Sequence, residues 1–231
     1  MTDLLKYAHT HIPVKYFLSS YRALSDGRSG VRHLEQILAA ERLFISEWKI
    51  AWIGTCAVLR TAIDLFKLDG RSCLSSEIRR EIKIEWRDIA DHRNTHPIFW
   101  EFLRKERDNI VHDYQWTAYE TWIKPDGSTR EAKSLATLYV EEDGAKPFIL
   151  MRGGYYSGRD SLELLNEGAD WVEARIFDSI RRAGFDPNEY RNISTFAPRP
   201  TLRRTVMGSA ILSGGDNDES SIDPEAGSIA Q

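Results

Sequence analysis

The chain has 231 residues, enough for one large domain or two small ones, and its 42% hydrophobic content can supply a sizeable core. Its formal net charge of -4 at pH 7 argues against a protein that coats nucleic acid without specificity, because that affinity comes from neutralising phosphates. No apolar run reaches the roughly 20 residues of a membrane span, and the amino-terminal sequence lacks the apolar segment of a signal peptide. We therefore expect a cytoplasmic protein that has no membrane as a partner.

The charge is distributed unevenly along the chain. Residues 214–231 contain five acidic side chains and no Lys or Arg, so the preceding part is close to neutral and can hold a local basic cleft. From residue 188 the composition shifts to Ser, Pro and Arg and then to Gly, Ser and acids, with too few apolar side chains to fold alone. We expect a folded domain over 1–190 and a disordered tail over 191–231, basic and then acidic. The alternative for the tail is a partner-binding segment around 206–212.

Apolar residues at helical spacing dominate the first half of the chain. A short helix is expected over 14–24, closed by a turn at 25–27, and a long helix over 31–68, with a break plausible near Gly54. Ser75 or Ser76 would cap the next helix. The core side of that helix is expected to be Ile78, Ile82, Trp86 and Ile89. Because short connections favour antiparallel neighbours, the pattern predicts an antiparallel helical bundle.

The hydrophobic period changes after residue 119. Short runs over 121–124, 135–140 and 148–152, separated by turns, predict a small antiparallel sheet. The helical period returns over 161–183, and this last long helix is expected to stop at Gly184 and to pack back on the bundle. Cys56 and Cys73 are too far apart for a zinc knuckle and are expected to be reduced and buried. The expected fold class is therefore mainly α, with a β insertion at about 121–152 before the last long helix.

A helix expected over 99–119 carries the main chemical signal. Arg107 falls in the apolar sector of that helix together with Ile110, so its guanidinium needs a partner. Asp108 and His112 are four residues apart, and the carboxylate is therefore expected to orient the imidazole. Arg107 and His112 lie about 140° apart around a helix, so one helix does not easily aim both at one atom. A second copy of the helix would close that gap.

The order Arg, four residues, His, one residue, Tyr, with Asp directly after the Arg, resembles the signature of the HEPN family, small helical proteins that include ribonuclease toxins. The resemblance covers 31–119 by helix pattern and is specific in 107–114. The shorter form, Arg, four residues, His, also occurs at Arg28 to His33 and at Arg87 to His92, where Asp88 follows the Arg. Such matches arise readily by chance in a chain with this many arginines. Compact HEPN proteins are helical throughout, so the β insertion departs from the family pattern and weakens any transfer of a specific partner or substrate.

The resemblance implies a homodimer in which a two-fold axis brings the two motifs into one cleft, and this cleft cleaves RNA with neither metal nor cofactor. His112 would be the acid or base and Arg107 would stabilise charge developing on the phosphate, while Asp108 orients His112. Tyr114 and Asn109 are the expected substrate-binding or modification residues. Some family toxins pair with a nucleotidyltransferase antitoxin that adenylylates the motif tyrosine. Bulk and negative charge at Tyr114 would block a phosphate-binding cleft.

Two readings from other classes of protein stay open. The first is a non-catalytic helical dimer that binds nucleic acid or a partner protein, with Arg107 and His112 as interface residues. The second is an antitoxin-like regulatory subunit whose tail makes the contact. His112→Ala separates the first from the enzyme, because an enzyme loses activity and keeps its assembly state, whereas an interface protein loses assembly or affinity.

Overall fold

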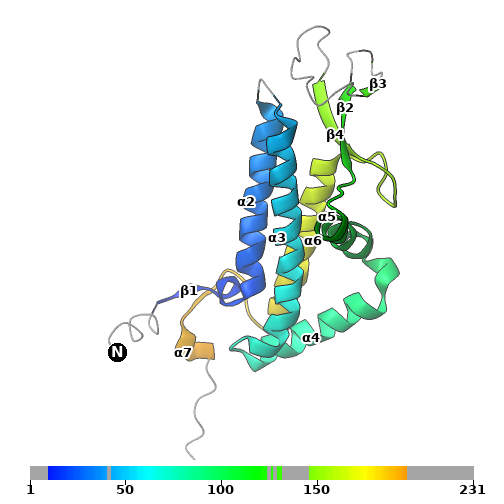
Figure 1. Ribbon diagram of the computed structural model, residues 1–231. Coiled ribbons are helices and arrows are strands. Elements are labelled where there is room, and N and C mark those ends of the chain that lie inside the picture. The colour runs from blue at the N-terminus through cyan, green and yellow to red at the C-terminus, as the bar shows by residue number, and fades with distance from the viewer. Residues whose placement is uncertain (1–9, 41–42, 124–125, 127–128, 132–145, 197–231) are drawn as a thin grey trace, which may run out of the picture. The chain divides into compact units, whose positions relative to one another are not determined.

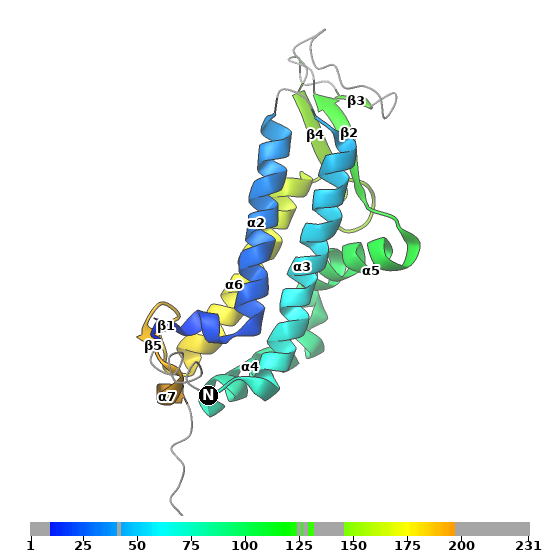
Figure 2. The ribbon, with the colours of Figure 1, turned by 60° about the vertical axis from the view of Figure 1, so that its left-hand side comes forward.

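Three long helices lie side by side at the centre of the fold (Figures 1 and 2). The computed structural model describes residues 10–40, 43–123, 126, 129–131 and 146–196, all of which belong to one structural unit. Helices α2 (Ser19–Ala39) and α3 (Ile45–Ser72) run antiparallel, and α6 (Ser161–Arg182) packs against both. Their facing sides form the core. Its largest fully buried side chains include Trp48, Trp52 and Phe66, all on α3.

Helices α2 and α3 approach closely where α2 carries glycine. A Cβ atom at Gly27 would lie 2.5 Å from Cδ2 of Leu59, and one at Gly30 would lie 2.3 Å from Oγ1 of Thr55. A larger residue at either position would have to displace the Leu59 or the Thr55 side chain. The sequence predicted a turn at 25–27, and this prediction is wrong: α2 continues through these residues, because Gly27 serves helix packing rather than a turn.

The other predicted boundaries in this region also shift. The chain enters through a short 3-10 turn, η1 (Val14–Phe17), rather than through a helix over 14–24. The helix predicted over 31–68 is divided between α2 and α3, and the division falls after Ala39 rather than near Gly54. A side chain at Gly54 would point into open space, so α3 passes through this glycine unbroken.

The amino terminus of α2 is capped from a distant part of the chain. Asp69, near the end of α3, is buried and accepts hydrogen bonds from the backbone N–H groups of Ser19 and Ser20, at 3.2 and 2.9 Å, and from the Ser20 hydroxyl at 2.7 Å. A carboxylate at this position satisfies free N–H groups and interacts favourably with the helix dipole. This contact joins the two antiparallel helices at one end.

Helix α4 (Ser76–Asp91) leads away from the end of α3 and runs across the long helices (Figure 2). The Ser75 hydroxyl caps it by accepting from the N–H of Ile78 at 3.2 Å, as predicted. Three of the four predicted core residues of α4 are buried and Trp86 is partly buried. Glu81 and Glu85 are buried as well and form ion pairs with Arg182 and Arg175 of α6, which fix α4 against that helix.

The helix predicted over 99–119 is shorter than expected and has two parts. A short 3-10 turn, η2 (Arg93–Thr95), leads to a π-helical segment, η3 (Ile98–Leu103), which continues into α5 (Arg104–Asp113). Helix α5 ends at Asp113 and runs across α3 rather than along it (Figure 2). The antiparallel arrangement therefore holds for α2 and α3 but not for α4 and α5.

A small antiparallel sheet follows α5, as predicted. Strand β2 (Ala118–Ile123) pairs with β3 (Thr129–Glu131) on one side and with β4 (Lys146–Met151) on the other. The strand predicted over 135–140 lies outside the described residues. Helix α6 follows β4 and ends before Gly184, whose φ of 87° suits a glycine at the end of a helix.

Ordered structure extends past the predicted domain end at residue 190. Strand β5 (Tyr190–Arg191) pairs with β1 (Ile12–Pro13), and a short helix, α7 (Ile193–Phe196), follows. The remainder of the predicted tail, 197–231, lies outside the described residues. Cys56 and Cys73 are free and buried, as predicted, and burial raises the pKa of the Cys56 thiol well above its ordinary value. In the described part of the chain, none of the helices combines the length and apolar character that crossing a membrane requires.

Candidate nucleic-acid interface

Helix α5 is held in place by a buried carboxylate. Glu106 is 2% exposed and accepts a hydrogen bond from the indole Nε1 of Trp52 on α3 at 2.8 Å. It also accepts from the backbone N–H of Thr117 at 3.1 Å and from the Thr117 hydroxyl at 2.5 Å. One carboxylate thus joins α5 to α3 and to the segment that leads into β2.

The sequence predicted that Arg107 lies on the buried side of α5. The charged residue that lies there is Glu106. The Arg107 side chain is 38% exposed, and its Nη1 donates to Oδ1 of Asp108 at 3.0 Å. Asp108 also lies 3.5 Å from Nε of Arg104. The prediction that Asp108 orients His112 is wrong, because two guanidiniums occupy its carboxylate. His112 is exposed and makes no hydrogen bond or ion pair with any residue that the structure describes.

Tyr114 lies at the end of α5 and not within a helix. Its φ of 52° is in the left-handed region, which residues other than glycine rarely adopt. The side chain is 67% exposed and its ring meets that of Trp116 edge to face, with centroids 6.1 Å apart. Nζ of Lys49 lies 4.5 Å from the Tyr114 ring centroid and 3.7 Å from that of Trp116. A cation and two exposed aromatic rings thus meet beside the end of α5.

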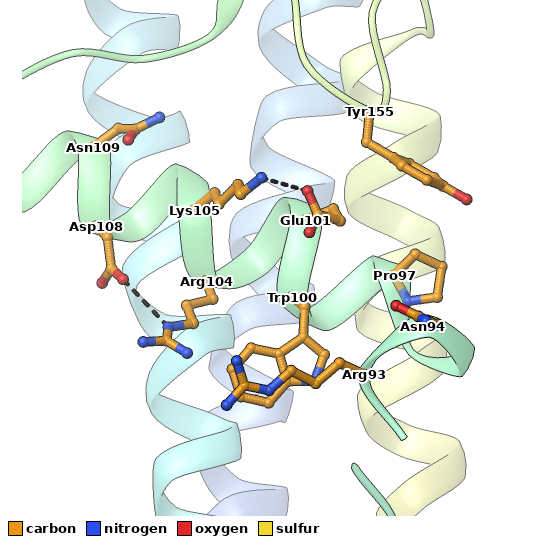
Figure 3. Close-up of a pocket in the computed structure, with 10 residues that line it drawn as sticks. All are labelled: Arg93, Asn94, Pro97, Trp100, Glu101, Arg104, Lys105, Asp108, Asn109 and Tyr155. Atoms are coloured by element: carbon orange, nitrogen blue, oxygen red, sulfur yellow. Dashed lines mark hydrogen bonds and ion pairs between the residues drawn. The ribbon is translucent and has the colours of Figure 1, made fainter. Parts of the chain in front are cut away.

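A groove with a volume of about 710 Å³ runs along the surface of η3 and α5 (Figure 3). We call it the cationic groove. It is lined by Arg93, Asn94, Pro97, Trp100, Glu101, Arg104, Lys105, Asp108, Asn109 and Tyr155. Of the predicted site residues, Asp108 and Asn109 line it, whereas Arg107 and His112 do not.

Trp100 is the central aromatic group of the cationic groove. Its indole Nε1 donates to the backbone carbonyl of Ile89 at 2.9 Å, which fixes the ring against α4. The guanidinium carbons of Arg93 and Arg104 lie 4.4 and 4.9 Å from the ring centroid, and Figure 3 shows Arg93 stacked on the indole. These distances are within the range of cation–π attraction, so the ring holds both guanidiniums at the groove surface.

Two further hollows continue the cationic groove towards the sheet. The first shares Glu101, Lys105, Asn109 and Tyr155 with it and extends to Thr117, Arg152 and the loop 153–156. The second is lined by 114–117 and Arg152, and so reaches the exposed rings beside Lys49. Lys105 is paired with Glu101 (Figure 3), and Arg152 is exposed. Aromatic rings, cations and the carboxylates of Glu101 and Asp108 therefore line these neighbouring hollows.

A second cluster of charged groups lies where α4 ends. The Asp88 carboxylate binds two imidazoles: its Oδ1 lies 2.9 Å from Nδ1 of His92 and its Oδ2 lies 3.0 Å from Nε2 of His96. These hydrogen bonds, that from His96 first, hold the pKa of Asp88 below its ordinary value. The sequence predicted a contact between carboxylate and imidazole at Asp108 and His112. The structure forms such a contact at Asp88 and His92, in the copy of the short motif that begins at Arg87.

The sequence did not indicate Trp100 or Arg93 as site residues. Arg93 lies on η2, outside any periodic pattern, and Trp100 was one apolar residue of a predicted helix. The only signal was the density of aromatic and basic residues around the motif. Among the residues that the structure describes, no group of three or more His, Cys, Asp or Glu side chains is placed to hold a metal ion. Comparisons of the chain with protein-family models, with curated proteins and with solved structures found no match.

Proposed function

We propose that the protein binds single-stranded RNA along the cationic groove and the two hollows that continue it. The observation that carries the proposal is Trp100, an aromatic ring held at the groove surface with the guanidiniums of Arg93 and Arg104 over it. Proteins that bind single strands combine a positively charged groove for phosphates with aromatic rings on which bases stack. The net charge of -4 does not by itself oppose this proposal, because the groove lining carries three cations, Arg93, Arg104 and Lys105, against the two carboxylates of Glu101 and Asp108.

A single strand fits this surface better than a duplex. Bases in a duplex are already stacked on one another, whereas unpaired bases offer their faces to aromatic side chains. Tyr155 is 66% exposed and Tyr114 is 67% exposed, so both rings are open to such contacts. The choice of RNA over DNA rests on the HEPN resemblance of 107–114.

The test is the affinity of the full chain for a fluorescent RNA oligonucleotide with 2′-O-methyl groups, which prevents cleavage during the measurement. Trp100→Ala should weaken binding by about 5- to 150-fold, because the indole and the guanidiniums that it holds form the stacking surface, and stacking contributes about 1–3 kcal/mol per base. Arg93→Ala with Arg104→Ala should reduce the slope of log affinity against log salt by roughly 1 to 2. Arg32→Ala, an exposed arginine of α2 outside the groove, is the matched control.

Each variant is first compared with the wild type by thermal unfolding, because Trp100 is also bonded to Ile89. The proposal would be overturned if the folded Trp100→Ala variant and the folded Arg93→Ala, Arg104→Ala double variant bound the oligonucleotide as tightly as the Arg32→Ala control. A preference for single-stranded DNA over RNA would keep the groove and overturn the choice of RNA.

Metal-independent endoribonuclease activity of the HEPN type is the second candidate function. The observation in its favour is that Arg107 and His112 are both accessible to solvent on α5 and that His112 is not engaged by the described residues. One helix does not easily aim both groups at one atom across their offset of about 140°, so the candidate includes a homodimer in which a second copy of the chain supplies one of them. The exposed Tyr114 would be accessible to a nucleotidyltransferase partner.

This candidate is tested by incubating the protein with RNA in excess chelator, with Arg107→Ala and His112→Ala in parallel and the mass measured in solution. Cleavage by a dimer that both substitutions abolish would support it. A monomer, or cleavage unchanged in both variants, would refute it. A dimer that binds RNA without cleaving it would favour the non-catalytic alternative.

A further inference from the structure

Four exposed cations gather where α3 meets α4. Lys67 and Arg71 are four residues apart on α3, and each is exposed. Lys83 and Arg87 have the same spacing on α4 and are exposed as well, so each pair lies on one side of its helix. The two helices touch between the pairs, because a Cβ atom at Gly70 would lie 3.6 Å from Cγ of Lys83. We call these four cations the α4 patch.

The cations of the α4 patch have no carboxylate partner, since none of the four forms an ion pair with a residue that the structure describes. Most carboxylates of the two helices are engaged elsewhere: Asp64 with an arginine of α3, Glu81 with arginines of α4 and α6, and Asp88 with two imidazoles. Asp91 is four residues after Arg87 but is not paired with it. Like charges four residues apart on a helix repel each other, so two such pairs side by side favour an anionic partner.

A row of aromatic rings joins the α4 patch to the cationic groove. Nζ of Lys67 lies 5.1 Å from the ring centroid of Trp86, within the range of cation–π attraction. The ring of Phe99 lies between two indoles, with its centroid 6.2 Å from that of Trp86 and 4.8 Å from that of Trp100. Phe99 is buried, whereas both indoles are partly exposed. In Figure 1, α4 extends from the end of α3 towards the segment that leads into α5. A strand leaving the groove past Trp100 would thus reach the patch along α4.

We propose that single-stranded RNA leaving the cationic groove continues across α4 and that the α4 patch binds its phosphates. The proposal rests on the RNA binding proposed above, and it requires neither a second copy of the chain nor a reaction. The two surfaces divide the work. The groove offers rings for stacking, but Glu101 and Asp108 offset most of its positive charge. The patch offers cations without paired carboxylates, which is what a phosphate backbone requires.

The spacing and the position of the α4 patch favour a strand as its occupant. Residues four apart rise about 6 Å along a helix, which is close to the separation of neighbouring phosphates in an extended strand. Lys83 and Arg87 can therefore contact successive phosphates. An acidic protein or an anionic membrane would also be attracted by the four charges. Continuity with the rings of the groove distinguishes the strand from both.

The experiment compares the affinity of the full chain for fluorescent 2′-O-methyl RNA oligonucleotides of about 5 and about 16 nucleotides, near the two ends of the range of single-strand site sizes. Lys83→Ala with Arg87→Ala should weaken binding of the long oligonucleotide by about 2- to 30-fold, the combined contribution of two exposed ion pairs. Its slope of log affinity against log salt should fall by roughly 1.4, because each neutralised phosphate of a single strand contributes about 0.7. The short oligonucleotide, which fills only the groove, should bind with unchanged affinity.

Two matched variants control for charge and for fold. Lys83→Arg with Arg87→Lys keeps both charges and should recover the affinity that the double alanine variant loses. Arg32→Ala with Arg181→Ala removes the same charge from exposed positions on α2 and α6 and should bind both oligonucleotides like the wild type. Thermal unfolding verifies that each variant is folded.

The outcomes separate this inference from the proposed function. It would be overturned if the folded Lys83→Ala, Arg87→Ala variant bound the long oligonucleotide as tightly as the Arg32→Ala, Arg181→Ala control, or if both oligonucleotides lost affinity equally. Unchanged RNA affinity with loss of binding to phosphatidylglycerol vesicles would likewise overturn it, in favour of a membrane surface. In these cases weaker binding by Trp100→Ala would still support the groove. Absence of binding to either oligonucleotide by the wild type would refute the proposed function and this inference together.

Discussion

Removal of the buried carboxylate of Glu106 should be the most damaging single change to α5. Glu106→Ala leaves three donors without an acceptor: the Trp52 indole, the Thr117 N–H and the Thr117 hydroxyl. At about 1 kcal/mol for each hydrogen bond, the expected loss in the free energy of unfolding is roughly 3 kcal/mol. For a chain of this size that corresponds to a fall in Tm of about 6–12 °C.

Two comparisons make this prediction specific to the hydrogen bonds of Glu106. Glu106→Gln keeps one oxygen as an acceptor for Trp52, and its amide can donate to the Thr117 hydroxyl, so the expected loss is only about 1 kcal/mol. Glu101→Ala removes a carboxylate of η3 whose ion pair with Lys105 is at the surface, and should cost less than about 1 kcal/mol. Urea unfolding followed by circular dichroism gives all three values. A loss for Glu106→Ala no larger than that for Glu101→Ala would refute the reasoning.

Four further substitutions have effects that follow from local geometry. Gly30→Ala should destabilise the fold, because its Cβ would lie 2.3 Å from a side chain of α3, whereas Gly54→Ala should stabilise it by about 0.5–1 kcal/mol, as measured by thermal unfolding. Ser75→Ala should cost about 1 kcal/mol in the same measurement through loss of the α4 cap. Hydrogen bonds from His96 and then His92 lower the pKa of Asp88 in the folded protein. The ionised carboxylate therefore stabilises the fold at pH values above about 4, the ordinary pKa of an aspartate. That contribution disappears as the pH falls through the lowered value, so wild type should lose more stability than Asp88→Asn below about pH 4.

The elements that the sequence predicted well are those whose signals are local. Helix α4 has a serine cap and a regular apolar side, and α6 has a regular apolar side and a glycine after its last turn. The antiparallel sheet after α5 was predicted from the change of period, and its first and last strands are confirmed. These signals are contained within a few residues and do not depend on how the elements pack.

The boundaries that were wrong depend on contacts with distant residues. Taken alone, Gly27 predicts a turn. In the structure it lies within a helix and packs against Leu59, which is more than 30 residues away in the sequence. The end of α5 at Tyr114 has no glycine to mark it, because the left-handed conformation is adopted here by a tyrosine. Residues 99–119 therefore read as one helix in the sequence.

The predicted orientation of Arg107 was wrong for a similar reason. The phase of α5 was taken from its apolar residues, and that placed Arg107 on the buried side. The charged residue that is buried on that side is Glu106. A hydrophobic pattern cannot identify a buried glutamate, because burial depends on its hydrogen-bond partners, Trp52 on α3 and Thr117 in the segment before β2. The Arg107 copy of the motif was preferred to the Arg87 copy because it carries a tyrosine and lies on a long amphipathic helix predicted to start at Pro97. The hydrogen bond from imidazole to carboxylate is formed in the Arg87 copy.

The π-helical segment η3 sets the angular relation between the two ends of the cationic groove. Trp100 and Glu101 lie on η3, whereas Arg104 and Lys105 lie on α5, whose turns are tighter. The wider turn accommodates about one residue more than an α-helical turn, so the same residues wound as an ordinary α-helix would rotate what precedes them by about 100° relative to α5. The indole would then face away from Arg104 although every groove side chain was still present. A substitution that converts η3 to an ordinary α-helix should therefore disturb the groove even when it leaves every lining residue in place, and the winding of the segment is as much a part of the site as its residues.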